Sequence, residues 1–396
     1  MQFINLKNYL DHLVENENVP SVDCIVCKNH KEIFRYYTGY RDIEKSIKVD
    51  GSELYIIYSM TKMITVTCAL QLMEHGKFKL SDRIDKWLPE FSKMKIACSE
   101  LNQENAKKIT TGASATEQGE EQYNGYAKTP ITVEHLLTMG AGLDYATKDK
   151  VLTSAIQSGK KTTLELVRAM ADKTLGFEPG TRFRYSLFHD VLGGLIEIWS
   201  GKTLNEYLQE NLCKPLGLKN TFFGLPKDSE RLSKMATRYE YDQNHKPRRL
   251  PLENGYILTE EYQSGGAGLV STAEDYATFL DALACGGVAK TGNRILQAQT
   301  IELMKTNHMK GEQVNDFYAL RRGYGYGFGV RTHVDPIKSK SLSPIGEFGW
   351  DGAAGAFSMV DVDNNLSLTY FQQIHGWDVG MQDRLRNALY LDLKNQ

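Results

Sequence analysis

LYIIYSMTK, residues 54–62, joins an apolar, strand-like run to the start of a helix. Apolar residues recur at helical spacing from position 63 to position 73, and the helix is predicted to end near Gly76. Ser59 would then lie in the first helical turn, where backbone N–H groups have no partner within the helix and the helix dipole is positive. Lys62 follows three residues later, so it shares a face with Ser59 and can reach its hydroxyl.

This Ser-x-x-Lys pair is a candidate for nucleophilic catalysis. A serine hydroxyl is a poor nucleophile until a neighbouring base takes its proton. Lys62 can be that base if burial lowers its pKa. The backbone N–H of Ser59 can also help to hold a developing oxyanion. The spacing alone is weak, because an N-cap serine followed by a surface lysine gives the same pattern.

Two further segments can complete such a site. PGTRFRYSL, residues 179–187, ends in a tyrosine that can project into a cleft and relay a proton, so Tyr185 is a candidate acid or base. FGWDGAAGAF, residues 348–357, is a strand-like run of small residues that lets a substrate lie close to the backbone. A strand edge here offers a second oxyanion N–H, from Ala353. Taken separately, Tyr185 is better explained as a packed aromatic, and a bulge or tight corner explains the small residues equally well.

The remaining pattern predicts strands at both ends of the chain. Strand-like runs lie at about 22–28 and 32–38, joined by a turn at 29–31, and again at 324–331, 348–362 and 366–373, with a hairpin turn at 363–365. Apolar stripes predict a helix at each end of the chain, around Leu6–Leu13 and Met381–Leu389. A further helix is predicted after Ser271, which has capping-box spacing to Glu274.

The middle of the chain is mostly helical in pattern, with predicted helices at 133–139, 164–173, 190–199 and 204–212. Residues from about 94 to 128 are polar and predict a long surface loop. The order of strands, helices and strands predicts an α/β (α+β) fold. An antiparallel sheet flanked by helices is built from both chain ends, with a mostly helical domain inserted. We expect residues 1–78 and 265–396 to form the α/β lobe and residues 79–264 the helical lobe.

Composition limits the class of partner. The 396 residues carry a net charge of −2, which gives no reason to expect nucleic acid as a ligand. No apolar stretch of membrane-spanning length occurs, and the N-terminus lacks a secretory pattern, so we expect a cytoplasmic protein with no membrane partner. The six cysteines are scattered and have no metal-ligand spacing. Cys24 and Cys27 lie in a predicted strand and face opposite ways, so reduced core thiols are expected.

In order and spacing, these motifs resemble the serine β-lactamase and penicillin-binding-protein superfamily. More narrowly, they are similar to its class C β-lactamase-like branch, which includes family VIII esterases and D-aminopeptidases. The resemblance extends to ITVEHLLT (131–138), FEPGT (177–181) and SGGAGLVST (264–272). It implies a site between two lobes, with Ser59 as nucleophile, Lys62 and Tyr185 as general base and acid, and the Ser59 and Ala353 N–H groups as oxyanion donors. It implies no metal and no cofactor.

The chain departs from the family pattern at two positions. The branch usually has Tyr-x-Asn at the second motif, where the Asn orients the lysine and binds the substrate amide, but this chain has Leu187. Lactamases usually have Lys-Thr-Gly or His-x-Gly at the third motif, whereas this chain has Trp350, Asp351 and Gly352, similar to some family VIII esterases. This change removes a cation that would meet a penicillin carboxylate. Both departures argue against efficient β-lactam hydrolysis.

The sequence therefore predicts a serine hydrolase that acts through an acyl-enzyme on small acyl esters. A D-amino-acid peptidase or amidase, a β-lactamase-like hydrolase, an acyltransferase and a non-catalytic binding protein on the same scaffold remain alternatives. The oligomeric state is left open. His189 and Asp190 resemble two members of a Ser-His-Asp triad, but adjacent residues rarely have that geometry, so a helix-start role is favoured. His135 is expected to be packed, and Gly265–Gly268 to allow close packing near the cleft.

Overall fold

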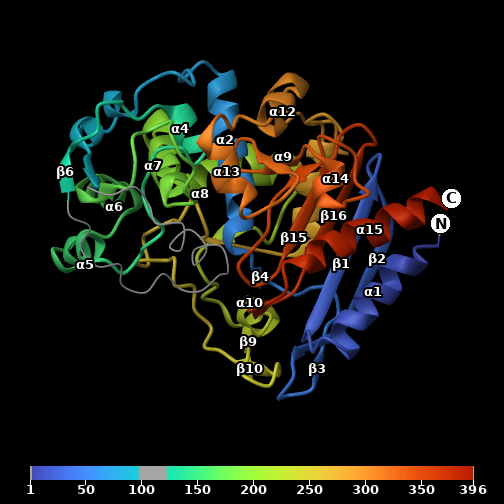
Figure 1. Ribbon diagram of the computed structural model, residues 1–396. Helices are drawn as coiled ribbons and strands as arrows, with labels where there is room; N and C mark the ends of the chain where they lie inside the picture. The colour runs from blue at the N-terminus through green and yellow to red at the C-terminus, as the bar shows by residue number, and fades with distance from the viewer. Residues whose placement is uncertain (1, 98–122, 396) are drawn as a thin grey trace.

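Eight antiparallel strands from both ends of the chain form the central sheet of the computed structural model, which describes residues 2–97 and 123–395 (Figure 1). The strand order is β12-β13-β14-β15-β16-β1-β2-β3. At its centre β1 (Ser21–Lys28) pairs with β16 (Leu366–Phe371), with Asp23 opposite Phe371 and Lys28 opposite Leu366. β2 (Lys31–Asp42) and β3 (Ile47–Lys48) extend the sheet on one side, and β15 (Phe357–Asp361) extends it on the other. The predicted fold class is confirmed.

Helices cover both faces of this sheet. On one face α1 (Ile4–Glu15) and α15 (Gly380–Lys394) lie side by side, close to both termini (Figure 1). On the other face α11 (Ala273–Ala284) packs against β1, β15 and β16. Cys24 lies in the cluster beneath α1 and α15, whereas Cys27 packs against the cluster on the other side. The prediction that these two cysteines face opposite ways is confirmed.

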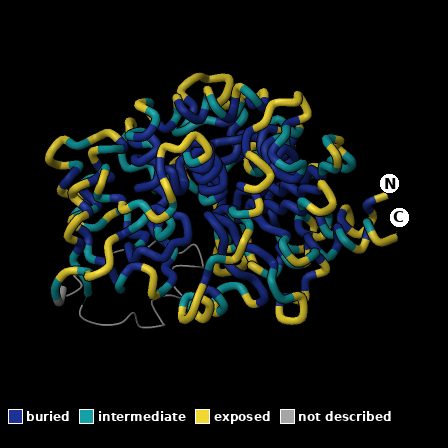
Figure 2. Tube along the Cα trace, turned by 90° about the horizontal axis from the view of Figure 1, so that it is seen from above, coloured by how far each residue is buried: buried dark blue, intermediate teal, exposed yellow. Residues whose placement is uncertain are grey.

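The helix after Ser59 is α2 (Thr61–Glu74), and it is buried on all sides from Thr61 to Leu72. Figure 2 shows that buried segments fill the interior of the molecule and exposed ones lie at its edges. The expectation of a single apolar face was therefore incomplete. The helix packs against the helices α7 (Phe188–Ser200) and α8 (Leu204–Leu208), and its Met63 contacts Ser358 of β15 in the sheet. Its polar side chains consequently need internal partners. Thr65 donates to the Gly265 carbonyl and Thr67 to the Met63 carbonyl.

Two predicted strands are interrupted by turns. The run 324–331 divides into β12 (Tyr324–Tyr326) and β13 (Arg331–His333), because Gly329 adopts a φ of +69° in the connecting turn. The run 348–362 divides into β14 (Phe348–Gly349) and β15. Glycines make such turns possible and are hard to distinguish from strand glycines in a sequence.

Between residues 79 and 264 the described elements are mostly short helices: α4 (Val133–Leu137), α5 (Lys150–Gln157), α6 (Thr163–Ala169), α7, α8, α9 (Lys214–Leu216) and α10 (Ser229–Lys234). Within the described residues, short strands form three further sheets of three strands each. Their strand orders are β10 (Pro247–Arg249), β9 (Tyr239–Tyr241) and β17 (Ile374–His375); β4 (Tyr55–Ile56), β11 (Leu269–Ser271) and β8 (Phe222–Phe223); and β6 (Tyr123–Tyr126), β5 (Lys95–Ala97) and β7 (Thr174–Leu175). The prediction of a loop at 94–128 is wrong at both ends of this segment, because β5 and β6 pair there as strands. Residues 98–122 of the predicted loop lie outside the described residues.

The cap of α11 lies one residue later than predicted. The N-cap is Thr272, whose side chain accepts a hydrogen bond from the backbone N–H of Asp275 at 3.1 Å. Ser271 instead belongs to β11, and its hydroxyl bonds with Thr221.

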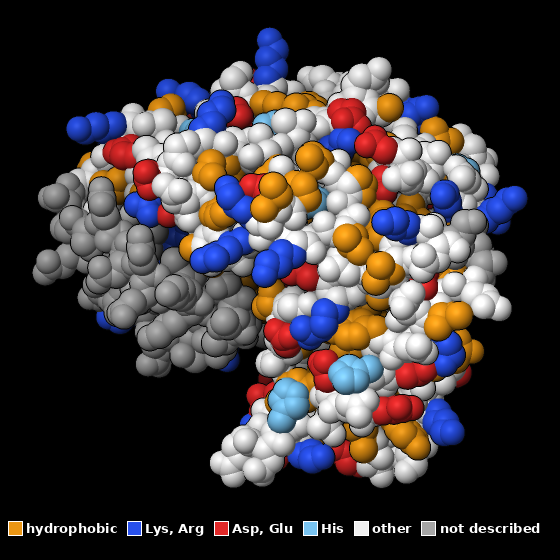
Figure 3. Space-filling model, turned by 45° about the vertical axis from the view of Figure 1, so that its right-hand side comes forward, with side chains coloured by type: hydrophobic (Ala, Val, Ile, Leu, Met, Phe, Trp, Pro, Cys, Tyr) orange, Lys and Arg blue, Asp and Glu red, His pale blue; other side chains and the backbone are white. Residues whose placement is uncertain are grey.

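On the face shown in Figure 3, acidic and basic side chains are interspersed among apolar ones.

Candidate active site

Ser59 lies at the junction of β4 and α2, in a 3₁₀ turn formed by Tyr58–Met60. It therefore precedes the α-helix by two residues, instead of belonging to its first turn as predicted. Ser59 is partly exposed, whereas the side chain of Lys62 is completely buried. The Lys62 Nζ lies 3.2 Å from the Ser59 Oγ, which is hydrogen-bonding distance. The expected contact between lysine and serine is present.

Lys62 is surrounded by uncharged oxygen acceptors. Its Nζ donates to the Tyr145 hydroxyl at 2.8 Å and to the Gly266 carbonyl at 2.7 Å, and among the described residues it makes no salt bridge. Burial lowers the pKa of Lys62 to about 7, although the negative charges of Asp190 and Asp351 act in the opposite direction. A substantial fraction of Lys62 is therefore neutral near pH 7 and able to accept a proton.

Tyr185 lies between two aromatic rings. It stacks on Tyr145 with ring centroids 5.3 Å apart and on Trp350 with centroids 5.5 Å apart. Its hydroxyl accepts a hydrogen bond from the Trp350 indole Nε1 at 3.0 Å, and the Lys62 Nζ lies 4.5 Å from its ring centroid. Burial raises the pKa of Tyr185 well above its usual value, although contact with the Ser59 hydroxyl opposes that rise. The phenol stays protonated at neutral pH and can donate a proton.

The third motif forms a tight turn beside the serine. Gly352 donates its N–H to the Ala356 carbonyl, and a Cβ on Gly352 would lie 2.7 Å from the Ile57 carbonyl oxygen. Only glycine fits this close approach to the backbone that leads into Ser59. Ala353 is thus on a turn, not on a strand edge as expected. Within the described part of the chain its N–H donates no hydrogen bond, while its carbonyl accepts one from Trp377.

The acidic side chain of the third motif, Asp351, forms a salt bridge with Arg321. The guanidinium of Arg321 donates to the Asp351 carboxylate at 3.0 Å. Both side chains are largely buried, at 17% and 13% exposed. The charge of Arg321 is therefore matched within the protein.

Leu187 is only 2% exposed and belongs to the hydrophobic core at the start of α7. Its backbone N–H donates to the Asp144 carbonyl at 3.1 Å. Tyr145, the next residue after Asp144, is among the groups that bond Lys62. The lysine contact that the family pattern assigns to an Asn at position 187 is thus replaced here by the Tyr145 hydroxyl and the Gly266 carbonyl.

Sequence reasoning missed Tyr145 and undervalued Asp190. Asp190 lies in the first turn of α7 as expected, but it is also fully buried, and it accepts a hydrogen bond from Tyr262 at 2.8 Å. Gly266 separates it from the lysine, because a Cβ there would lie 2.6 Å from the Asp190 Oδ2 and 3.4 Å from the Lys62 Nζ. This confirms the close packing expected of Gly265–Gly268.

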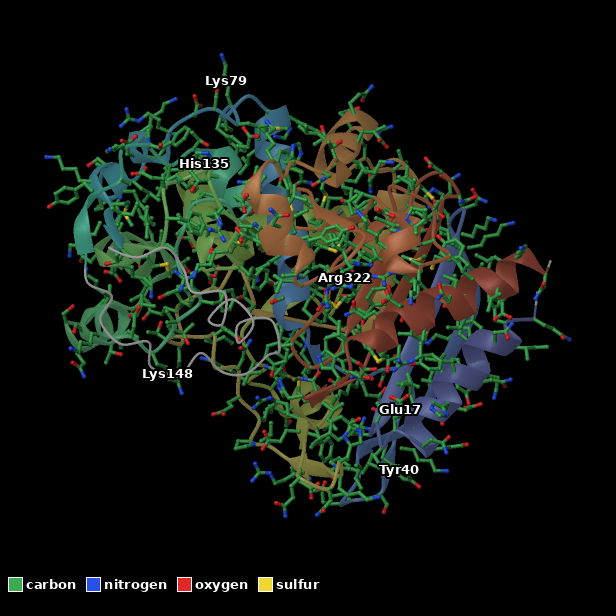
Figure 4. The ribbon with its side chains drawn as sticks, in the orientation of Figure 1. Glu17, Tyr40, Lys79, His135, Lys148 and Arg322 are labelled. Carbon is green, nitrogen blue, oxygen red and sulfur yellow. The ribbon has the colours of Figure 1, made fainter. Side chains whose placement is uncertain are left out.

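Neither His189 nor His135 belongs to a Ser-His-Asp triad. No hydrogen bond joins the ring of the buried His189 to another described residue, and burial lowers its pKa to about 3. A Cβ on Gly329 would meet its ring at 3.0 Å, so His189 is tightly packed. His135 lies on α4 (Figure 4), where it completes a capping box with Thr132.

Comparison with known proteins identifies the family. The family model described as Beta-lactamase matches residues 6–392, so the chain belongs to the β-lactamase family. Protein Rv1367c of Mycobacterium tuberculosis is 30% identical over 345 residues, covering 85% of this chain and 81% of that protein. Esterase EstB of Burkholderia gladioli is 25% identical and covers 96% and 93% of the two chains. The monacolin J acid methylbutanoyltransferase of Aspergillus terreus is 26% identical and covers 81% and 76%.

Solved structures agree on the fold. The structure of EstCE1, described as a hydrolase with promiscuous acyltransferase activity, matches with a TM-score of 0.78, 23% identity and 98% coverage of both chains. A family VIII carboxylesterase matches with a TM-score of 0.73 and 19% identity, covering 98% of this chain and 97% of that chain. At this level of identity the likeness concerns the fold. Among the described residues, no helix is both long and apolar enough to cross a membrane.

Proposed function

We propose that this chain is a serine hydrolase that forms an acyl-enzyme on Ser59 and acts on small acyl esters. The observation that carries the proposal is the environment of Lys62. This side chain is completely buried, bonded only to neutral oxygens, and 3.2 Å from a partly exposed serine hydroxyl. A lysine with a strongly lowered pKa beside a nucleophile is typical of a catalytic site.

The proposed reaction has two steps. In acylation, the Ser59 Oγ attacks the ester carbonyl carbon while Lys62 takes its proton, and the oxyanion accepts hydrogen bonds from the N–H groups of Ser59 and Ala353. Tyr185 gives its proton to the departing alcohol oxygen and regains one from Lys62. In deacylation, water attacks the acyl-enzyme carbonyl, the serine recovers its proton, and the carboxylic acid is released.

Esters are the proposed substrates because the site offers little to an amide or a β-lactam. The family pattern places an amide side chain at position 187, and Leu187, which is buried in the hydrophobic core, provides neither donor nor acceptor in its place. An amide whose polar groups are left unpaired loses about 1–3 kcal/mol, which corresponds to roughly 5- to 150-fold in rate. Arg321, which lies beside the third motif, already pairs with Asp351 and is less available to a substrate carboxylate.

Acyl transfer to an alcohol is a second candidate, because the relatives include the methylbutanoyltransferase of Aspergillus terreus as well as an esterase. The two activities share the acyl-enzyme and differ only in whether water or an alcohol accepts the acyl group. Product analysis with a nitrophenyl ester, in the presence and absence of a small alcohol, separates them. Free acid alone indicates hydrolysis, and a new ester indicates transfer.

The substrate class is tested by kcat/KM for a nitrophenyl ester and for a chromogenic cephalosporin. We expect the ester to be favoured, and the gap to narrow in the Leu187→Asn variant if that variant keeps its fold. Efficient cephalosporin turnover by the wild type would contradict the ester assignment. Release of D-amino acids from peptides at a rate above that for esters would favour the peptidase alternative.

A further inference from the structure

A second cluster of reactive side chains lies away from Ser59, where the β1–β2 turn meets the end of α11. His30 is in the two-residue turn after β1, and Asp281 and Cys285 lie four residues apart at the end of α11. Ligand atoms of these three side chains all lie within 4.8 Å of one another. We propose that His30, Asp281 and Cys285 form a binding site for a divalent zinc-like cation.

The geometry suits such an ion. Zinc binds imidazole nitrogen, carboxylate oxygen and thiolate sulfur at about 2.0–2.3 Å in a tetrahedral arrangement, which places ligand atoms roughly 3.3–3.8 Å apart. Ligand atoms within 4.8 Å of one another reach this spacing if side-chain rotations move them by about one ångström. The Nδ1 of His30 is now 2.7 Å from the Asp281 Oδ2, so zinc would replace this hydrogen bond by two metal–ligand bonds.

The three positions differ in rigidity. Asp281 is fixed, because its side chain is 9% exposed and its Oδ1 accepts the backbone N–H of His30 at 3.2 Å. The His30 side chain is 30% exposed, which gives an ion a route from solvent. Cys285 is half-buried, and its Sγ lies 3.9 Å from the Asp281 Oδ1. On binding, the thiol proton would pass to solvent as the sulfur–zinc bond forms.

The fourth position of a tetrahedral site is not filled by the three grouped side chains. Cys27 lies on β1 on the side of the sheet that packs against α11, but its thiol is not among the ligand atoms that lie within 4.8 Å of one another. The fourth tetrahedral position is therefore open to water, or to Cys27 if its side chain moves closer. This cluster could not be predicted from the sequence, because His30 and Asp281 are 251 residues apart.

The proposed role is structural. An ion bound by His30 in the β1–β2 turn and by Asp281 and Cys285 at the end of α11 would link these two segments. It would therefore stabilise the packing of α11 on the central sheet. For a chain of this length, a hundredfold excess of free Zn²⁺ over its Kd would raise Tm by about 3 °C. Ester hydrolysis should not need the ion, because the cluster is separate from the Ser59 site.

The test uses the untagged full-length protein, freed of metal by a chelator and titrated with Co²⁺ and then Zn²⁺. We expect one Co²⁺ with a sulfur-to-cobalt charge-transfer band that Zn²⁺ abolishes. Loss of a ligand in Cys285→Ala or His30→Asn should weaken binding by more than the ~10- to 100-fold that an outer-shell change costs. His30→Asn should fold, because asparagine favours such turns.

Cys24→Ala is the matched control, since Cys24 lies on the same strand as Cys27 but faces the opposite side of the sheet. It should leave the Co²⁺ spectrum unchanged, and Cys27→Ala should weaken the thiolate band only if Cys27 is the fourth ligand. Failure of the wild type to bind Co²⁺, or a spectrum unaltered by both Cys285→Ala and His30→Asn, would overturn the proposal. Either outcome leaves the Ser59 assignment untouched.

Discussion

Two buried lysines of this protein have opposite surroundings. Lys62 is 0% exposed and bonds to a serine hydroxyl, a tyrosine hydroxyl and a backbone carbonyl. Lys173 is 4% exposed but makes salt bridges with Asp144, at 2.9 Å, and with Asp149. Burial alone therefore does not determine what a lysine does; the charge of its immediate partners decides.

The different surroundings of Lys62 and Lys173 suit the two side chains to different tasks. Without a carboxylate in contact, burial lowers the pKa of Lys62 to about 7, which suits the role of base proposed for it. With two carboxylates in contact, Lys173 holds the segment 144–149 in place. That segment carries Tyr145, which bonds Lys62. The paired lysine thus helps to position a partner of the unpaired one.

Replacing each lysine by methionine should give opposite results. Lys62→Met removes the base and should lower kcat/KM for a nitrophenyl ester by about 10²- to 10⁴-fold with Tm unchanged or raised. Lys173→Met leaves Asp144 and Asp149 without a cation. It should cost stability near the lower end of the ~3–5 kcal/mol typical of a broken buried pair, because both carboxylates are about one-fifth exposed.

The same two variants also test how the lowered pKa of Lys62 makes the free energy of unfolding depend on pH. Unfolded Lys62 retains a proton up to pH 10.5, whereas the folded side chain loses it near pH 7. The unfolded chain therefore binds more protons across this window, so wild-type stability should gain from rising pH there. Lys62→Met should remove this contribution in denaturant titrations at several pH values. An equal activity loss in the two variants, or a Tm loss confined to Lys62→Met, would contradict the comparison.

Tyr185→Phe removes the proposed proton donor and should lower kcat/KM by on the order of 10²-fold. Its loss should not add to that of Lys62→Met, because both groups act on one proton path. The control is Tyr326→Phe, since the Tyr326 hydroxyl is buried and has no hydrogen-bond partner among the described residues. Unchanged turnover in Tyr185→Phe would leave Tyr185 as a packed aromatic.

The pH profile should show the base directly. We expect kcat/KM to rise with pH through a midpoint near 7, as Lys62 loses its proton. Asp190→Asn removes a negative charge that raises the pKa of Lys62, so the midpoint should move lower, by about one pH unit. Asp149→Asn, at the other lysine, should leave the midpoint in place. A midpoint moved upward by Asp190→Asn would contradict the account.

Tyr145→Phe should have the smallest effect. It removes one of three hydrogen-bond partners of Lys62 but keeps the ring that stacks on Tyr185. The loss of one neutral hydrogen bond, about 0.5–1.5 kcal/mol, corresponds to roughly 2- to 13-fold in kcat/KM. A loss as large as that of Tyr185→Phe would mean that Tyr145 itself handles the proton.

The sequence was most informative where spacing along one element sets the geometry. Ser59 and Lys62 are three residues apart at a strand–helix junction, and the alternation of Cys24 and Cys27 follows from strand geometry. The division of the run 324–331 by a turn at Gly329 was not predicted, and at Gly352 a strand and a tight corner were left as alternatives, because glycine is common to both structures.

Contacts between segments that are far apart in the chain could not be predicted from the sequence. Tyr145 bonds Lys62 from 83 residues away and lies in a loop without periodicity. The charge of Asp190 reaches Lys62 past Gly266, so its influence depends on tertiary packing. Asp281 meets His30 across 251 residues. In each case the local sequence fixes the residue's own element but not its partner.

The central claim is that Ser59 forms the acyl-enzyme, and intact-mass analysis tests it most directly. The wild type and Ser59→Ala would each be exposed to a serine-directed phosphonate, a nitrophenyl ester and a penicillin. Circular dichroism and Tm would confirm that the variant is folded. We predict one phosphonate adduct on the wild type, mapped to the peptide containing Ser59, and none on Ser59→Ala. Labelling of the alanine variant to the same extent, or an adduct mapped to another residue, would contradict the account.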